Sequence, residues 1–194
     1  MSASAQPQVR LWRRDEYHRA AEMGLFGPEE RLELLNGEII KKPSPQSYSH
    51  AHSIRLTAEI LRDLFANGYH VSEEKPLVLA DYSEPEPDIV VVRGSLRQAN
   101  GHPTPATAAL VIEVSDSSLQ YDQGDKATAY ARSGIADYWI VNLRLRCLEV
   151  RRDPSPIEDG EYRYRLLLVV AADGEIAPLE KPDRRIAVVD LLPN

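Results

Sequence analysis

The chain has 194 residues, of which 43% are hydrophobic and 27% charged, so it is long enough to bury a sizeable core. Its net charge of -7 argues against a protein that coats nucleic acid by charge alone, so any contact with DNA would have to be local. The single cysteine, Cys147, excludes an intramolecular disulfide and a cysteine-rich zinc site.

Domain organisation and compartment are predicted from the same features. We expect residues 1–8 to form a disordered tail and residues 9–194 to form one domain. No run approaches the roughly 20 apolar residues of a membrane span, and the first residues lack the apolar core of a signal peptide. We therefore expect a cytoplasmic protein that makes no membrane contact, and the lone Cys147 fits a reducing compartment.

A hairpin is predicted over residues 31–41. Two apolar runs are joined there by Asn36 and Gly37, and this dipeptide accepts the positive φ angles of a type I′ turn. Glu33 and Glu38 flank the turn. Both are interpreted first as solvated hairpin carboxylates.

Two helices are predicted on either side of the hairpin, a short one over residues 13–23 and a long one over residues 48–67 with apolar residues at helical spacing. His50 and His52 lie in the first turns of the long helix. Because they are two residues apart, they point in different directions and cannot form the i, i+4 pair of a helical zinc site. His52 is interpreted as a polar residue at a helix start, whereas the role of His50 stays open.

Several short strands are predicted in the rest of the chain. The β-branched run at residues 89–92 is typical of a strand buried on both faces, and Asp88 stands at its entrance. An Asp in that position is often only a turn or capping residue, so alone it carries little information. The other predicted strands, of which the last three form an antiparallel C-terminal extension, are residues 69–74, 77–80, 147–152, 162–170 and 185–189.

Residues 110–142 are predicted to form a strand, a helix and a second strand. Strand alternation places Glu113 and Ser115 on one face of the first strand. Burying an ionised carboxylate without a partner is costly, so Glu113 should face a cation, a hydrogen-bond network or water. In the helix, Asp122 and Lys126 lie on one side at i and i+4.

Together these segments predict a metal site. Asp88 and Glu113 at neighbouring strand ends, with the backbone carbonyl of Val114, would give hard oxygen ligands for Mg²⁺. A nearby Lys126 could orient the attacking water or stabilise the transition state of phosphodiester hydrolysis. The alternative is that Asp122 and Lys126 form only an exposed helical ion pair worth a few tenths of a kcal/mol.

Three motifs resemble the Uma-type endonuclease family, a branch of the PD-(D/E)xK restriction-nuclease superfamily: EPDIVVV, LVIEVSDSS and YDQGDKATAYARSGIADYWIVN. LELLNGEII and PSPQSYSH resemble the amino-terminal part of that family. The resemblance implies an α/β (α+β) fold with a restriction-endonuclease-like core, in which helices flank a central mixed β-sheet, with an N-terminal hairpin and a C-terminal antiparallel extension. It also implies a Mg²⁺-dependent DNA endonuclease, with Mn²⁺ able to substitute, acting as a homodimer.

The resemblance assigns roles to individual residues. Asp88 and Glu113 would be the metal-binding acids. The general superfamily pattern has a lysine two residues after the Glu, where this chain has Ser115, so Lys126 on the following helix would supply the ammonium, with Asp122 as its neighbour. Further candidates implied by the resemblance are Glu38 and His50.

A second hypothesis is a non-catalytic nuclease-fold module that binds a protein or nucleic-acid partner. It is motivated by the acidic net charge, by Ser115 in the usual lysine position and by the lack of an evident basic DNA-binding segment. Convergence of the two acids and Lys126 in one cleft would favour the enzyme.

Overall fold

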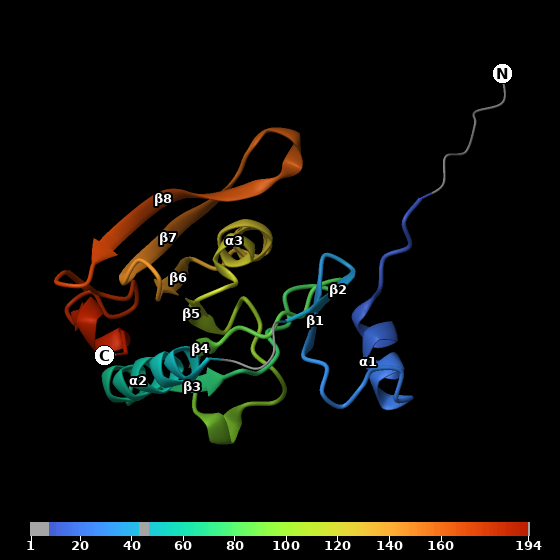
Figure 1. Ribbon diagram of the computed structural model, residues 1–194, viewed down its shortest axis with the longest axis horizontal. Coiled ribbons are helices and arrows are strands. Elements are labelled where there is room, and N and C mark those ends of the chain that lie inside the picture. The colour runs from blue at the N-terminus through green and yellow to red at the C-terminus, as the bar shows by residue number, and fades with distance from the viewer. Residues whose placement is uncertain (1–7, 43–46, 194) are drawn as a thin grey trace.

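The computed structural model describes residues 8–42 and 47–193. Helices flank a central sheet of six strands in the order β3-β4-β5-β6-β7-β8 (Figure 1). β5 and β6 are parallel and the other neighbours antiparallel, so the predicted α+β fold with a mixed sheet is confirmed. The tail predicted for residues 1–8 lies outside the described residues except for Gln8.

The two central strands of the sheet, β5 and β6, are its most buried segments. Every residue of β5 and β6 is buried, because both strands have neighbours on each side and cover on each face. The strands are β3 (Tyr69–Glu73), β4 (Ile89–Arg93), β5 (Ala108–Ser115), β6 (Asp137–Asn142), β7 (Cys147–Pro156) and β8 (Tyr162–Ala171). The predicted antiparallel C-terminal extension is formed by β7 and β8.

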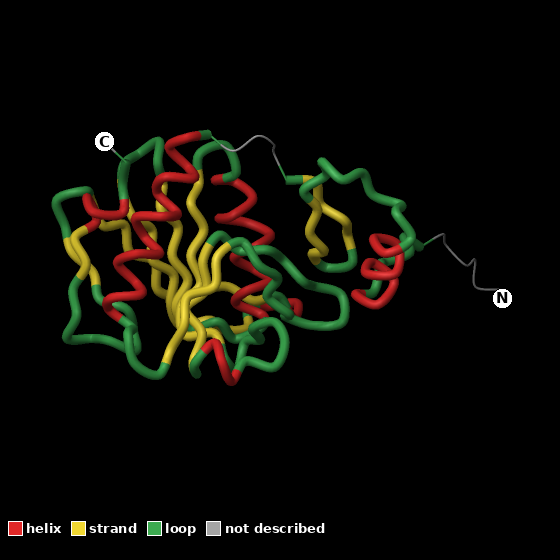
Figure 2. The backbone as a smooth tube through the Cα atoms, turned by 90° about the horizontal axis from the view of Figure 1, so that it is seen from below, coloured by secondary structure: helices red, strands yellow, loops and turns green. Residues whose placement is uncertain are grey.

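Helices cover both faces of the sheet (Figure 2). α2 (Tyr48–Leu64) packs Ile54 and Leu61 against Leu110, Ile112 and other apolar residues of one face. On the other face, Val111 packs with residues of α4 (Ala127–Arg132). The predicted alternation of residues 110–114 between the two faces is therefore confirmed.

The helical connection between β5 and β6 changes its winding along its length. It begins with α3 (Leu119–Tyr121), continues as a π-helical turn, η2 (Asp122–Lys126), and ends as α4. π turns are rare and occur mostly as single turns within α-helices, often at functional sites. This turn carries the two helix residues that the sequence singled out, Asp122 and Lys126.

The N-terminal hairpin stands beside the edge of the main body with α1 (Arg14–Glu22) against it (Figure 1). β1 (Leu32–Leu35) pairs with β2 (Glu38–Lys41). Asn36 and Gly37 both have positive φ, 52° and 80°, as the predicted type I′ turn requires. A bridge from β1 to Glu84 ties the hairpin to the segment that leads into β4.

The structure differs from the prediction at two expected strands: one is a loop, and the other is shorter than predicted. Residues 77–80 form a loop, because the backbone N–H groups of Leu77 and Val78 bond to loop carbonyls rather than to a strand. In the segment 185–189 only β10 (Ile186–Ala187) is extended, and η4 (Val188–Leu191) follows as a 3₁₀ turn. The remaining short elements are β9 (Glu175–Ile176), η1 (Leu96–Gln98) and η3 (Glu158–Gly160). No helix in the described ranges is long and apolar enough to cross a membrane.

The N-cap of α2 generates a stability prediction. The Ser47 hydroxyl accepts a hydrogen bond of 3.2 Å from the backbone N–H of His50, which satisfies a donor at the helix start. We expect Ser47→Ala to lower the free energy of unfolding by about 1 kcal/mol. Ser49→Ala, an exposed serine in the same turn, is the control and should have little effect; equal losses in urea unfolding would contradict the capping role.

Candidate active site

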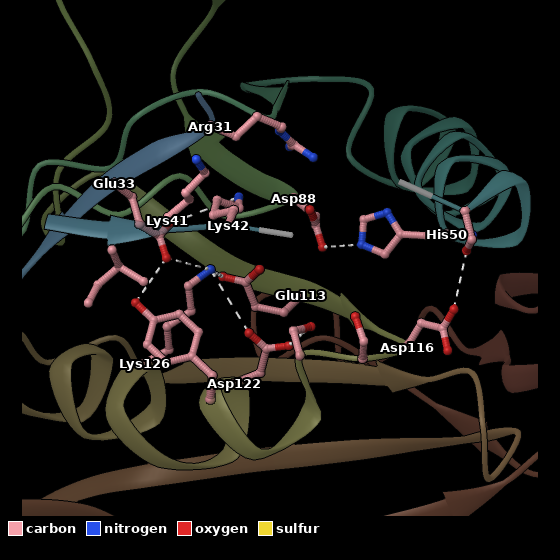
Figure 3. A pocket seen from close by; sticks show the side chains of 15 residues that line it. Arg31, Glu33, Lys41, Lys42, His50, Asp88, Glu113, Asp116, Asp122 and Lys126 are labelled. Carbon is pink, nitrogen blue, oxygen red and sulfur yellow. Dashed lines mark hydrogen bonds and ion pairs between the residues drawn. The ribbon is translucent and has the colours of Figure 1, made fainter. Parts of the chain in front are cut away.

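A cavity of about 380 Å³ lies between the hairpin, the start of α2 and the ends of β4 and β5 (Figure 3). Asp88, Glu113 and Lys126 line it together, although they come from the residue before β4, from β5 and from η2. Its lining residues are Arg31, Glu33, Ile40, Lys41, Lys42, Ser47, His50, Asp88, Glu113, Asp116, Ser117, Ser118, Tyr121, Asp122 and Lys126. The convergence that the sequence hypothesis required is present in this geometry.

Glu113 and Lys126 form a buried ion pair. The Lys126 ammonium donates to Glu113 Oε1 at 2.9 Å, and the Tyr130 hydroxyl donates to the same oxygen at 2.7 Å. Both ion-pair residues are 2% exposed. Asp122 is equally buried, so the alternative of an exposed helical ion pair between Asp122 and Lys126 is wrong.

Asp88 is fixed beside this pair by the neighbouring strand. Its Oδ2 accepts a 2.7 Å hydrogen bond from the backbone N–H of Val114 and lies 3.4 Å from His50 Nε2. Figure 3 shows His50 reaching Asp88 from α2 on the opposite side from Lys126. The residue whose carbonyl was predicted as a ligand, Val114, therefore directly holds one of the two predicted acids.

Glu33 also belongs to the cavity, which the sequence interpretation missed. Its side chain is fully buried, and its Oε1 accepts from the Tyr121 hydroxyl at 3.0 Å and lies 3.5 Å from the Lys126 ammonium. Its Oε2 accepts from the backbone N–H of Glu86 at 2.9 Å. The interpretation of Glu33 as a solvated carboxylate is wrong, because the hairpin packs against the segment before β4. The leucines on either side of Glu33 were the sequence feature that could have indicated a buried strand.

Ser115 serves the helix instead of supplying a charge. Its hydroxyl and that of Ser118 each donate to Asp122 Oδ2 at 2.6 Å. These bonds hold the start of the π turn against the end of β5. The position two residues after Glu113 is therefore held by an uncharged residue, Ser115. The ammonium that contacts Glu113 comes from Lys126 on the helix.

The two weaker candidates have different positions. His50 lines the cavity, whereas Glu38 is exposed and does not line it. Glu38 lies at the turn end of β2, and residues nearer the other end of that strand face the cavity. One of the cations beyond β2, Lys42, was missed; its ammonium donates to the Glu86 carbonyl at 2.7 Å and lies 4.0 Å from Glu33 Oε2.

The two predicted metal ligands have opposite pKa shifts. Burial raises the pKa of Glu113 above its usual value, while the Lys126 ammonium at 2.9 Å opposes the rise and favours the ionised carboxylate. Burial also acts to raise the pKa of Asp88, but the hydrogen bond and charge of His50 outweigh it, and that pKa lies below its usual value. Of these two carboxyls, Asp88 is therefore the one that ionises more readily.

The charge of Lys126 depends on the carboxylates around it and in turn affects the pKa of Glu33. Burial acts to lower the pKa of Lys126, but Glu113, Glu33 and Asp122 outweigh it and hold that pKa well above its usual value. Lys126 is therefore charged at neutral pH. Burial acts to raise the pKa of Glu33, but Lys126 and Lys42 reverse the shift and leave it below its usual value.

The two acids fit a hard divalent cation. Asp88 Oδ1 and Glu113 Oε2 accept no hydrogen bond from any described residue, and both side chains line the cavity. Mg²⁺ is usually bound by one or two protein carboxylates and keeps several waters. Among the described residues there is no group of three or more His, Cys, Asp or Glu that could hold a metal ion, so the protein would supply only these two carboxylates.

Removing the Lys126 charge should destabilise the fold in a pH-dependent way. In Lys126→Met the buried carboxylates lose their cation, which should cost about 3–5 kcal/mol at neutral pH. Because Lys126 helps to hold the Glu33 pKa below its usual value, Glu33 contributes stability above its unfolded pKa, and this contribution is lost as the pH falls.

The difference in unfolding free energy between wild type and Lys126→Met should therefore be larger near pH about 7, above the usual pKa of a glutamate, than near pH about 3, below it. Urea unfolding at both pH values measures it. Lys41→Met, which removes an exposed lysine of the cavity mouth, is the control and should change stability by at most about 0.5 kcal/mol. A difference that is independent of pH would contradict the charge assignment.

Comparisons with known proteins agree with the fold and the motifs. The Uma2 family model, described as "Putative restriction endonuclease", matches residues 14–182. The chain is also similar to the crystal structure described as "a putative nuclease belonging to DUF820 from Anabaena variabilis ATCC 29413", with a TM-score of 0.65 and 16% identity over 91% of this chain and 95% of that chain. No curated protein matches the chain. Because the family model spans most of its length, the chain belongs to the Uma2 restriction-endonuclease family, as its motifs predicted.

Proposed function

We propose that this protein is a Mg²⁺-dependent endonuclease that hydrolyses phosphodiester bonds of DNA. The observation that carries the proposal is the buried Glu113–Lys126 pair next to Asp88 in one cavity. Membership of a family described as putative restriction endonucleases supports a nuclease. The metal dependence and the roles of individual residues are proposed from the side chains that line the cavity. Mn²⁺ is the expected substitute for Mg²⁺.

Asp88 and Glu113 are the proposed ligands of the metal, with the backbone carbonyl of Val114 as a third oxygen. The cation, when bound, neutralises charge that develops on the phosphate and lowers the pKa of water. Because burial raises the pKa of Glu113, its use as a ligand is favoured as the pH rises. Asp88, with its lowered pKa, is the ligand available over the wider pH range.

Lys126 is the proposed positioning group for the attacking water. Its ammonium is charged and is held by Glu113 and Glu33, at 2.9 and 3.5 Å, so its direction is fixed before substrate binds. A preoriented ammonium also stabilises negative charge as the phosphate passes through its transition state. Tyr130 and Tyr121 support the two carboxylates through hydrogen bonds.

The lining of the cavity includes positive charge, although the protein as a whole is acidic. Arg31, Lys41 and Lys42 line it together with the acids. The exposed ion pairs of Arg31 with Glu74 and of Lys41 with Glu30 are of the kind that contributes about 0–1 kcal/mol, so a DNA phosphate can replace them. This local cluster agrees with the expectation that DNA contact is confined to a small area.

Assembly and compartment remain part of the proposal. A protein with one such site per chain cuts both strands of a duplex most directly as a pair, which is the basis for proposing a homodimer. The single cysteine, buried and unpaired at the start of β7, fits the proposed cytoplasmic location.

A plasmid-nicking assay tests the function. With Mg²⁺ or Mn²⁺ the wild type should relax supercoiled plasmid, and Glu113→Gln and Asp88→Asn should each lower the rate by at least about 100-fold. Glu38→Gln, an exposed carboxylate of the same hairpin outside the cavity, is the matched control and should retain activity. Equal nicking by all four proteins would reject the site, and DNA binding without any nicking would favour the non-catalytic module.

Cation binding provides a separate prediction. Calorimetric titration with Mn²⁺ should show one site per chain in the wild type, and Asp88→Asn should weaken it by about 10-fold or more because a charged ligand is lost. Chelation by EDTA should stop nicking, and added Mg²⁺ should restore it. Full nicking in excess EDTA would contradict metal dependence.

A further inference from the structure

Two carboxylates occupy one row across the central sheet. In the strand register Glu113 of β5 pairs with Ile140 of β6, and Ile140 pairs with Glu149 of β7. Directly opposed residues of neighbouring strands project from the same face, so Glu113 and Glu149 lie on one face, two strand spacings apart. α4 lies on this face, because its residues Ala127 and Tyr130 pack in one cluster with Ile140.

The π turn joins the two ends of this row. At one end Lys126 donates to Glu113 at 2.9 Å, and at the other the Gln123 side-chain amide donates to both oxygens of Glu149, at 2.8 and 2.9 Å. A π turn contains more residues than an α turn, so residues three apart are separated more widely around the axis. Gln123 and Lys126 can therefore reach strands on either side of Ile140.

Glu149 is itself firmly held. It is 8% exposed and accepts hydrogen bonds at 3.1 Å from Asn142 Nδ2 and from Arg151. A second support comes from Tyr138, whose hydroxyl donates at 2.9 Å to the backbone carbonyl of Asp122 at the start of the turn. The sheet thus presents a fixed acceptor to the turn at a place outside the cavity, since Glu149 does not line it.

We propose that Glu149 is a positioning residue for Lys126 and acts through Gln123. The inference rests on the proposed function only in giving Lys126 a role in cleavage; the mechanical link stands on the contacts alone. An isolated π turn is less favourable than continuous α-helix, so it persists where surrounding contacts hold it. Loss of the Gln123–Glu149 contact lets the turn relax and moves the ammonium away from Glu113. A displacement of about 1 Å at a reacting group can cost about 100-fold in rate.

Gln123→Ala, Glu149→Ala and the double variant test the link through rates of cleavage. Each single variant should lower kcat by about 10-fold with KM unchanged, because the DNA-binding cations are untouched. The double variant should match Glu149→Ala, since the two residues act in series. Glu149→Gln, which retains one amide-to-oxygen bond, should recover part of kcat. Asp125→Ala, an exposed residue of the same turn, is the control and should behave as wild type.

A readout independent of cleavage is the acetylation rate of Lys126, measured by peptide mass spectrometry relative to the exposed Lys41. Release of Lys126 from its 2%-exposed position should raise its relative rate by at least about fivefold in Gln123→Ala and Glu149→Ala, but not in Asp125→Ala. Gln123→Ala is the decisive variant, because its side chain is exposed and its loss leaves the core intact.

The outcomes separate this inference from the proposed function. A wild type that cleaves no DNA rejects the nuclease proposal, and the acetylation rates then decide the positioning role alone. Unchanged kcat and unchanged Lys126 acetylation in Gln123→Ala overturn the inference even in an active enzyme. Additive losses in the double variant also overturn it, because they show that Glu149 acts by another route.

Discussion

The buried ion pair between Glu113 and Lys126 is the constraint on which the rest of the site depends. Two charges removed from water cost several kcal/mol each, and mutual attraction offsets this only with good geometry and additional hydrogen bonds. Here the Tyr130 hydroxyl donates a hydrogen bond to Glu113. The carboxylates of Glu33 and Asp122 lie within 4.0 Å of the Lys126 ammonium. Glu33 comes from the hairpin, Glu113 from the sheet, and the other three residues from the helical connection between β5 and β6, so the pair forms only when hairpin, sheet and helix are all in place.

The position of the ammonium explains the unusual local structure. Ser115 stands where a lysine on the strand would reach the cavity directly, and its hydroxyl holds Asp122 instead. The ammonium instead reaches Glu113 from Lys126, the last residue of the π turn. The position of the ammonium therefore depends on how a helix packs over three strands, and not on a short segment of one strand.

Much of the fold could be predicted because its signals are local. The positive φ angles at Asn36 and Gly37, the alternation around Glu113 and the helical spacing of α2 each depend on a few neighbouring residues. Residues 77–80 were predicted wrongly because their apolar character reflects contact with loops, which a strand pattern cannot distinguish. The π turn has no sequence signature of its own, since the contacts that hold it come from β5, β6 and β7.

The site shows the same division. Asp88, Glu113 and Lys126 were found from residue type and motif order, whereas Glu33 and Lys42 enter the cavity through the position of the hairpin, which tertiary contacts determine. Lys126 is proposed to act in place of a strand lysine. The most direct measurement is the single-turnover rate of DNA cleavage by Lys126→Met with saturating Mg²⁺, at a temperature where circular dichroism shows it folded. We expect a rate at least about 100-fold below wild type, and a wild-type rate would rule out this role of Lys126.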